Sequence, residues 1–465
     1  MSTQILDRST VPAPGVPKDV TFPNYFESRL PNGLKVIVYE DHTLPLVSVN
    51  MVAYGGAAFD GDYPGLADMT AELLTKGTAT RSANDIVDEI EFLGGSIGSG
   101  AGWDSMSVGI SILSRHVDRA MEVLADTTRH PAFPEEEIDR VRQQRLSDIL
   151  QNKSNPTSLA YERFCGAVFG THPYAQPADG TSASVEAMQE EQFRAFHRAR
   201  FTADNCFLIL VGDVQPDAMM EYAERLFGDM AADASGERSV PQPAVPQGRL
   251  VQVVDRPSAV QSSILVGHVG IARNHEDYIA VYLLNMVFGG FFGSRLNLNL
   301  REDKGFTYGA HARFDARIQP GPFSAGAEVR NEVTDRAIEE ILHEMERIRS
   351  EAVSEEELEK VKNYVTGSFP LQIETAAQVA QRIVTIELYG LDKTYYNSFN
   401  SRILALTTDD ILHAARKWMH PEKAVIVAAG RGNLLRNTLE RFGAVDVFDP
   451  QGARIPNIES QAQDT

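Results

Sequence analysis

The stretch Gly65-Leu-Ala-Asp-Met-Thr-Ala-Glu-Leu-Leu-Thr-Lys-Gly-Thr78 says more about the fold of this chain than any other segment. In a helix, Asp68 and Glu72 are four residues apart and therefore lie on one face. Ala71 comes directly before Glu72. The spacing is that of a metal-binding helix, but the three positions carry two carboxylates and a methyl group.

The spacing matches the inverted zinc motif H-x-x-E-H, in which two His side chains bind zinc and the Glu is the general base. Asp68 and Glu72 stand at the two His positions, and Ala71 stands at the Glu position. The flanks Gly65–Ala67 and Lys76–Thr78 complete a segment that resembles the pitrilysin/insulinase family of zinc metallopeptidases. The chain thus resembles this family and lacks the residues of its active site.

Length and composition limit the fold and the partners. A chain of 465 residues is too long for one hydrophobic core, so it predicts at least two domains, and a hydrophobic content of 43% is enough to bury them. The net charge of −21 argues against nucleic acid and anionic membranes as partners. It favours basic peptides, although only weakly at physiological salt.

Cysteine content and the terminal sequence predict a cytoplasmic protein by default. Cys165 and Cys206 are too few for a disulfide framework. Residues 1–20 are polar and contain Pro, without the apolar region of a signal peptide, and no stretch approaches the ~20 apolar residues of a membrane span. A periplasmic location would follow if a leader preceded this sequence.

Two acidic helix starts occur once in each half of the sequence. An Asp-Arg-Ala triplet begins at Asp118 and another at Asp335, and a Glu triplet begins at Glu135 and another at Glu355. The distance along the chain between the two Asp-Arg-Ala triplets is nearly the same as that between the two Glu triplets. The alternative is chance recurrence of such starts, but the steady offset favours duplication of a ~200-residue domain. The predicted organisation is a flexible tail (1–22), an N-terminal peptidase-like domain (23–231), a linker (232–248), a C-terminal peptidase-like domain (249–445) and a second tail (446–465).

Each half combines strand and helix patterns. β-Branched runs predict strands at 34–39, 46–53, 206–212 and 424–430, and helical periodicity dominates at 83–93, 335–348 and 355–367. The predicted fold class is α+β, with two homologous domains that each pack helices on one face of an antiparallel-rich sheet.

The segment from Gly293 to Tyr308 resembles the substrate-side element of the bacterial two-domain branch of the family. In that branch an Arg, and a Tyr seven residues later, face the zinc across the cavity. The resemblance implies that Arg301 holds a peptide carboxylate or carbonyl and that Tyr308 donates to the developing oxyanion, which are roles that suit a guanidinium and a phenol. The alternative is a surface Arg and a half-buried Tyr without function.

The resemblance also implies a third metal position, Asp148, on a later helix than Glu72. Asp68, Glu72 and Asp148 would form an all-oxygen cluster, which is unsuited to tight zinc binding and would hold Ca²⁺ or Mg²⁺ weakly. An empty or salt-bridged site is the preferred expectation. Since Ala71 cannot accept a proton, no autonomous zinc proteolysis is expected, and no metal is assigned to this chain.

Glycine patterns offer a competing catalytic motif. Gly94-Gly-Ser96-Ile-Gly98 matches G-x-S-x-G, but a nucleophile elbow follows a strand and opens a helix, whereas here a helical segment precedes and an alternating strand follows. The match is therefore attributed to chance. Gly289, Gly290 and Gly293 do not form a phosphate-binding fingerprint and are expected at close-packing or hinge positions.

Two functions remain open. The first is the non-catalytic subunit of a heterodimeric zinc metallopeptidase, in which a homologous subunit carries H-x-x-E-H and the zinc, while this chain supplies Arg301 and Tyr308. The second is a scaffold or peptide-binding protein of the same fold without a role in catalysis. A copurifying partner of similar size that carries H-x-x-E-H would distinguish them.

Overall fold

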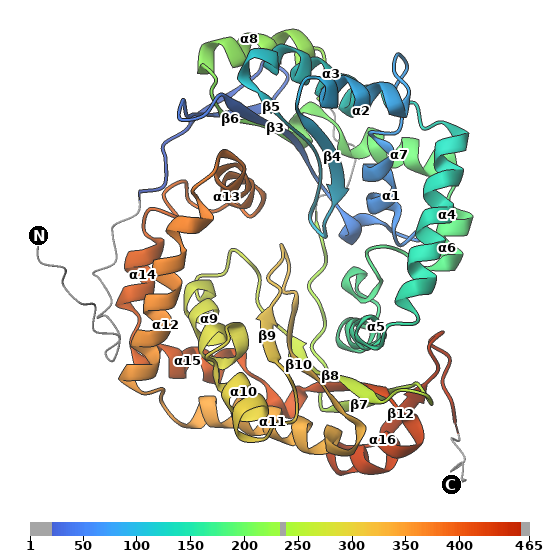
Figure 1. Cartoon of the computed structure of the whole chain (residues 1–465), viewed down its shortest axis with the longest axis vertical. Helices are drawn as coiled ribbons and strands as arrows, with labels where there is room; N and C mark the ends of the chain where they lie inside the picture. Colours follow the sequence, from blue (N-terminus) through green and yellow to red (C-terminus); the bar gives the residue numbers. More distant parts are fainter. Residues whose placement is uncertain (1–20, 233–238, 457–465) are drawn as a thin grey trace, which may run out of the picture.

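Two six-stranded sheets, one from each half of the sequence, form the framework of the molecule. The structure is a computed structural model, and it describes residues 21–232 and 239–456. The first sheet has the order β1-β2-β6-β3-β5-β4 and the second β12-β7-β11-β8-β10-β9. In Figure 1 the first half occupies the upper right and the second half the lower left. The predicted α+β class with two homologous domains is confirmed.

The strands of the first sheet are β1 (Phe26–Arg29), β2 (Lys35–Glu40), β3 (Leu46–Tyr54), β4 (Ser96–Ala101), β5 (Ser105–Leu113) and β6 (Cys206–Gly212). Those of the second are β7 (Leu250–Asp255), β8 (Gln261–Val269), β9 (Ala310–Phe314), β10 (Pro322–Arg330), β11 (Val425–Gly430) and β12 (Val445–Phe448). In both sheets one inner pair is parallel, β2 with β6 and β7 with β11, and the next three pairs are antiparallel.

The helices of the first half are α1 (Leu66–Leu73), α2 (Ala83–Phe92), α3 (Val117–Arg129), α4 (Glu135–Asn152), α5 (Pro156–Phe169), α6 (Ser182–Ala187), α7 (Glu190–Arg200) and α8 (Pro216–Phe227). Those of the second are α9 (Tyr278–Asn285), α10 (Arg295–Asn297), α11 (Thr334–Ser350), α12 (Glu355–Ser368), α13 (Ala376–Leu388), α14 (Phe399–Ala405), α15 (Thr408–Trp418) and α16 (Gly432–Leu439). Two π-helical turns, η5 (Met286–Gly290) and η6 (Leu298–Asp303), flank α10.

Helices and strands beyond the two acidic helix starts are also repeated in the two halves. Helices α4 and α12 begin at Glu135 and Glu355, and the helices that follow them, α5 and α13, begin at Pro156 and Ala376 with the same separation along the chain. The strand orders also correspond, except at the outer edge. There β1 runs antiparallel to β2, whereas β12 runs parallel to β7.

The two halves exchange helices. Alternate residues of a strand point to opposite faces, so each sheet has two apolar faces to cover. On the first sheet, Ile37 and Phe207 share a hydrophobic cluster with Ile383 of α13, which comes from the second half. On the second sheet, Val427 packs with Phe164 of α5, which comes from the first half.

Polar contacts also join the two halves of the chain at this interface. Lys35 forms an ion pair with Glu387 of α13 at 2.8 Å. The Asp104 carboxylate accepts hydrogen bonds from the Tyr389 hydroxyl and the Ile318 backbone N–H, both at 3.2 Å. These contacts and the exchanged helices join the two halves.

Both predicted tails need correction. Most of residues 1–22, the linker residues 233–238 and the end of the C-terminal tail lie outside the described residues. However, Phe22 is 1% exposed, with its ring 5.3 Å from that of Tyr396, because the core of the second half offers it an apolar site. The boundary predicted at 445/446 falls inside β12, which pairs with β7.

The expectation about apolar segments also needs correction. Within the described residues, one helical run, Tyr278–Asp303, is long and apolar enough by length and composition to cross a membrane, with a mean hydropathy of 1.4. Of its most apolar window, 61% is buried inside the protein. A core helix passes the same test, so the run is weak evidence for a membrane span.

Candidate functional site

Helix α1 is fixed at its N-terminus by a buried carboxylate. Asp60, 7% exposed, accepts hydrogen bonds from the backbone N–H groups of Gly65 at 2.7 Å and Ala67 at 2.8 Å. Both N–H groups belong to the first turn, which has no intrahelical acceptors. Burial raises the pKa of Asp60 to about 8, against the opposing effect of these hydrogen bonds. Gly65 has φ +92°, and a Cβ there would lie 2.8 Å from the Gly180 Cα, so the position requires glycine.

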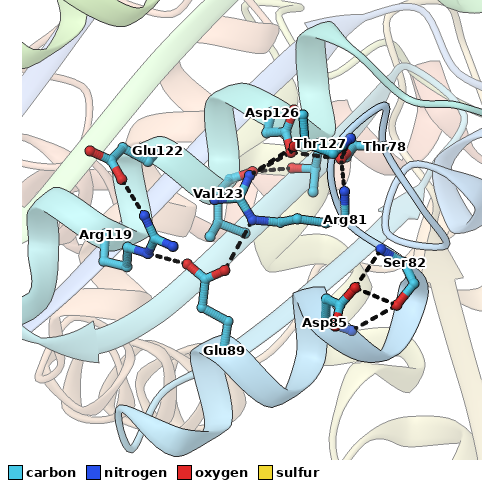
Figure 2. Close-up of polar contacts among 11 residues, drawn as sticks. Thr78, Arg81, Ser82, Asp85, Glu89, Arg119, Glu122, Val123, Asp126 and Thr127 are labelled. Carbon is cyan, nitrogen blue, oxygen red and sulfur yellow. Dashed lines mark hydrogen bonds and ion pairs between the residues drawn. The ribbon is translucent and has the colours of Figure 1, made fainter.

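The segment after α1 is fixed just as firmly. Figure 2 shows Thr78 and Arg81 both directed at Asp126 of α3. The Thr78 hydroxyl donates to Asp126 Oδ2 at 2.7 Å and Arg81 Nη1 donates to the same oxygen at 2.6 Å. Arg81 Nε also donates to Glu89 Oε2 of α2 at 3.0 Å. Thr78 of the flank that carries the family resemblance thus contacts α3, and Arg81 beyond it contacts both α3 and α2.

Between these anchors, α1 presents its two carboxylates to α4. Asp68 and Glu72 are partly exposed, while Ala71 is 0% exposed and lies in the core of the first half. Arg145 of α4 spans the two carboxylates: its Nη2 forms an ion pair with Asp68 Oδ2 and lies 3.4 Å from Glu72 Oε2. Burial raises the pKa of Asp68, and the Arg145 guanidinium opposes that rise.

The third carboxylate does not join this group. Asp148 lies one turn further along α4 and accepts a hydrogen bond from Gln144 Nε2 at 2.9 Å. Within residues 21–232 and 239–456, no three His, Cys, Asp or Glu side chains are grouped closely enough to hold a metal ion. An empty or a salt-bridged site was expected from the sequence, and Asp68 and Glu72 are salt-bridged by Arg145.

These residues do not fit zinc. Neither motif position offers an imidazole, and a guanidinium, which stays protonated and cannot coordinate a metal, lies between the two carboxylates. Ala71 has no group that accepts a proton. Without a ligand set and a base, the helix has no route to activate water.

Arg145 was missed from the sequence. It lies one turn before Asp148 on the same predicted helix. A cation three residues before Asp148 lies on the same face of the helix and can pair with a nearby carboxylate, and this was the available signal. The sequence alone does not show that α4 packs against α1. This contact places Arg145 between Asp68 and Glu72.

A cavity of about 680 Å³ borders this site. It lies between α4, α5 and the segment 175–182, and the charged side chains that line it are Asp68, Lys153, Glu162 and Asp179. Its walls include Trp103, Leu150 and Tyr161, and Leu150 is 74% exposed. A cavity with apolar walls and several carboxylates suits a peptide side chain.

The Arg/Tyr element lies in the second half: Arg301 is on η6, at the end of the run α9-η5-α10-η6, and Tyr308 is in the loop that leads from η6 to β9. Asn297 of α10 clamps the start of β9: its Nδ2 donates to the Ala310 carbonyl at 2.7 Å, and its Oδ1 accepts from the Ala310 N–H at 3.0 Å. Gly289 packs against β9 so closely that a Cβ would lie 2.6 Å from the Ala312 Cβ. The expected close-packing role is thereby confirmed for Gly289. The segment that joins η6 to β9 is thus held at both ends.

Arg301 and Tyr308 lie on this clamped element. The Arg301 guanidinium stacks over the Phe292 ring at 4.4 Å from its centroid, and Arg301 Nε is 3.4 Å from Glu302 Oε1. Tyr308 is 93% exposed, far more than the half-buried alternative supposed. In the described part of the chain, no hydrogen bond or ion pair joins either side chain to Asp68 or Glu72, and Figure 1 places α1 and α10 in different lobes.

The structure also places Ser96. It is the first residue of β4, an edge strand that follows α2, so the order is helix then strand. A nucleophile elbow has the reverse order. The interpretation of Gly94–Gly98 as a chance match is confirmed.

Comparison with known proteins identifies the family. Residues 35–182 match the family "Insulinase (Peptidase family M16)", and residues 187–365 match "Peptidase M16 inactive domain". An uncharacterised zinc protease of Rickettsia bellii is 28% identical over 362 residues, which are 77% of this chain and 86% of that protein.

Solved structures agree. The peptidase M16 inactive domain from Pseudomonas fluorescens has a TM-score of 0.83 at 28% identity and covers 88% of this chain and 98% of its own. A protease from Helicobacter pylori, at 20% identity, shares the fold with a TM-score of 0.81 and covers 88% of this chain and 99% of its own. The resemblance first inferred from the helix around Asp68 and the segment around Arg301 is confirmed, and the chain belongs to the insulinase family of peptidases, M16.

Proposed function

We propose that this chain is the non-catalytic subunit of a heterodimeric zinc metallopeptidase and supplies Arg301 and Tyr308 to the zinc site of a homologous partner. The observation that carries the proposal is the contrast between helix α1, whose two carboxylates are bridged by Arg145, and the 93% exposed Tyr308 on a clamped element. The match to an inactive-domain family over residues 187–365 supports it.

In this proposal each side chain has a distinct task. The Tyr308 hydroxyl donates a hydrogen bond to the oxygen of the scissile carbonyl as negative charge develops on it. Such a donor acts mainly in the transition state, and its loss costs roughly 3 kcal/mol. Arg301 offers a planar fork of donors to a peptide carbonyl or carboxylate, and its stacking on Phe292 fixes the plane of that fork.

The second candidate, a peptide-binding protein without a role in catalysis, is favoured by the cavity beside Asp68. A site lined by apolar side chains and by the carboxylates of Asp68, Glu162 and Asp179 would bind peptide side chains without any contribution from Arg301 or Tyr308. Under this function the contacts of Arg301 with Phe292 and Glu302 are those of an ordinary surface arginine.

Reconstitution distinguishes the two. A homologue of similar size that carries H-x-x-E-H and copurifies with this chain is assayed for peptide turnover with and without it. We expect turnover to rise on addition of this chain and to stay at the partner-alone level with the double variant Arg301→Ala/Tyr308→Phe. Tyr222→Phe, on the distant helix α8, is the matched control. Equal stimulation by the double variant, with assembly intact, would leave the peptide-binding function.

A further inference from the structure

The loop from η6 to β9 is anchored on both sides of Tyr308. Before Tyr308, the Phe306 N–H donates to the Leu300 carbonyl at 2.9 Å, and the Phe306 ring packs against the core of the second half. After Tyr308, Asn297 bonds to both backbone groups of Ala310. Only three residues lie between these anchors, so a single side chain can close the turn that they form.

Thr307 closes this turn with its hydroxyl. The hydroxyl donates to the Gly309 carbonyl at 2.9 Å and accepts from the Gly309 N–H at 3.2 Å. Both bonds join the residue before Tyr308 to the residue after it, so they form a small ring with Tyr308 at its apex. Threonine hydroxyls hold turns by such local bonds to the backbone. The ring restricts the backbone of Tyr308 and thereby the direction of its Cα–Cβ bond.

The Tyr308 side chain has no such support of its own. It is 93% exposed, and within residues 21–232 and 239–456 no hydrogen bond or ring contact holds it. Arg301 differs, because its guanidinium stacks on Phe292 at 4.4 Å from the ring centroid. A group that acts on a transition state has to be held within about 0.5 Å of its working position. For Tyr308 this placement depends on the backbone turn that carries it.

We propose that Thr307 is a positioning residue for Tyr308 and that its hydroxyl directs the phenol toward the substrate carbonyl. The inference rests on the proposed function, in which the Tyr308 hydroxyl donates to the oxyanion, and it adds a residue that does not touch the substrate. Loss of the Thr307 hydroxyl leaves the phenol intact but allows the turn to open. Because a misplaced oxyanion donor weakens the transition state and not the bound peptide, the loss falls on kcat rather than on KM.

Hydrogen exchange of the full chain without a partner tests the turn itself. The exchange rate of the Gly309 amide is compared in the parent, in Thr307→Val, which keeps the shape without the hydroxyl, and in Thr307→Ser, which keeps the hydroxyl. We expect exchange about fivefold faster in Thr307→Val, as for the loss of one hydrogen bond, and the parent rate in Thr307→Ser. Equal rates in all three would overturn the inference, because the hydroxyl would then not hold the turn.

Steady-state kinetics of the heterodimer with the zinc-bearing homologue tests the positioning role. We expect Thr307→Val to lower kcat about tenfold with KM unchanged, and Thr307→Ser to restore most of kcat. Thr43→Val, at an exposed bend between β2 and β3, is the matched control and should keep the parent kinetics. Parent kcat in Thr307→Val, when Tyr308→Phe lowers it, would overturn the inference and leave the proposed function standing.

A double variant shows whether Thr307 acts through Tyr308. We expect Thr307→Val/Tyr308→Phe to have the same kcat as Tyr308→Phe alone, because the hydroxyl that Thr307 positions is already absent. A further tenfold loss in the double variant would overturn the inference, since Thr307 would then act independently of the phenol. Parent kcat in Tyr308→Phe would overturn the proposed function and this inference with it.

Discussion

Helix α1 of the first half and the segment from Arg301 to Tyr308 of the second half both carry charged or polar side chains on a firmly anchored element. On α1, the partly exposed Asp68 and Glu72 are bridged by Arg145, and Ala71 is buried. In the second half, Tyr308 projects into solvent and Arg301 is about one-third exposed. The contrast is between a helix whose two carboxylates share one arginine and a second element that leaves Tyr308 exposed to solvent.

The largest expected effect is a gain in zinc affinity when the zinc motif is restored in α1. We expect the parent chain to retain little zinc after dialysis, because its candidate ligands are Asp68, Glu72 and Asp148. The triple variant Asp68→His/Ala71→Glu/Glu72→His should gain zinc affinity, and adding Arg145→Ala should increase it further, since a guanidinium repels the metal. Elemental analysis measures the retained zinc. If neither folded variant binds more zinc than the parent, the assignment of this helix is wrong.

A smaller effect is expected on removing the bridging cation alone. Arg145→Met leaves the mostly buried Asp68 carboxylate without its partner, so we expect a loss of about 1–3 kcal/mol in the free energy of unfolding. Urea denaturation measures it. Arg140→Met, at an exposed position of the same helix α4, should change stability by less than about 0.5 kcal/mol.

Adding Asp68→Asn to Arg145→Met should recover part of the lost stability, because it removes the unpaired charge. No recovery would mean that Arg145 acts through the packing of its alkyl chain rather than through its charge.

The pH dependence of stability should reveal the buried cap of α1. The folded-state pKa of Asp60 is raised to about 8, above its ordinary value near 3.8, so the folded state binds a proton that the unfolded state has released. The contribution of Asp60 to stability is therefore complete below about pH 4 and is lost as the pH rises through 8. We expect the unfolding free energy to fall over this window and to fall less in Asp60→Asn.

The exposed Asp62→Asn is the control for that measurement, because its side chain lies outside the cap. A pH profile in Asp60→Asn identical to that of the parent would show that Asp60 stays ionised in the folded state at neutral pH.

In the reconstituted heterodimer, Arg301→Ala is expected to have a smaller effect than Tyr308→Phe. Since Arg301 would hold the peptide before and during reaction, its removal should raise KM about tenfold, which corresponds to ~1.4 kcal/mol. Steady-state kinetics over a range of peptide concentrations measures this. An unchanged KM would place the arginine outside the peptide site.

Local patterns predicted the elements of the fold well. The strand predicted at 206–212 is β6 with the same bounds, and the helix predicted at 355–367 is α12, one residue longer. These segments are apolar or strongly periodic along their whole length, so local preference and tertiary packing agree. The duplication was also predicted correctly, from repeated motifs such as those at Glu135 and Glu355 that have nearly the same separation along the chain.

What the sequence left undetermined depends on contacts between distant segments. The bridge from Arg145 to Asp68 joins α4 to α1, and the exchange of α5 and α13 joins each helix to the opposite sheet. Periodicity shows that a helix has an apolar face but not which sheet covers that face. The burial of Phe22 and the strand β12 were missed for the same reason, because their partners lie in the second half.

Turnover of the reconstituted heterodimer with Tyr308→Phe is the decisive measurement for a role of this chain in catalysis. The substitution removes one hydroxyl from a side chain that is 93% exposed, so folding and assembly should be preserved, which a binding assay verifies. We predict a fall in kcat of about 10²-fold, equivalent to roughly 3 kcal/mol, with little change in KM, because an oxyanion donor acts mainly in the transition state. Wild-type kcat with intact assembly would contradict the active-site role and leave a scaffold.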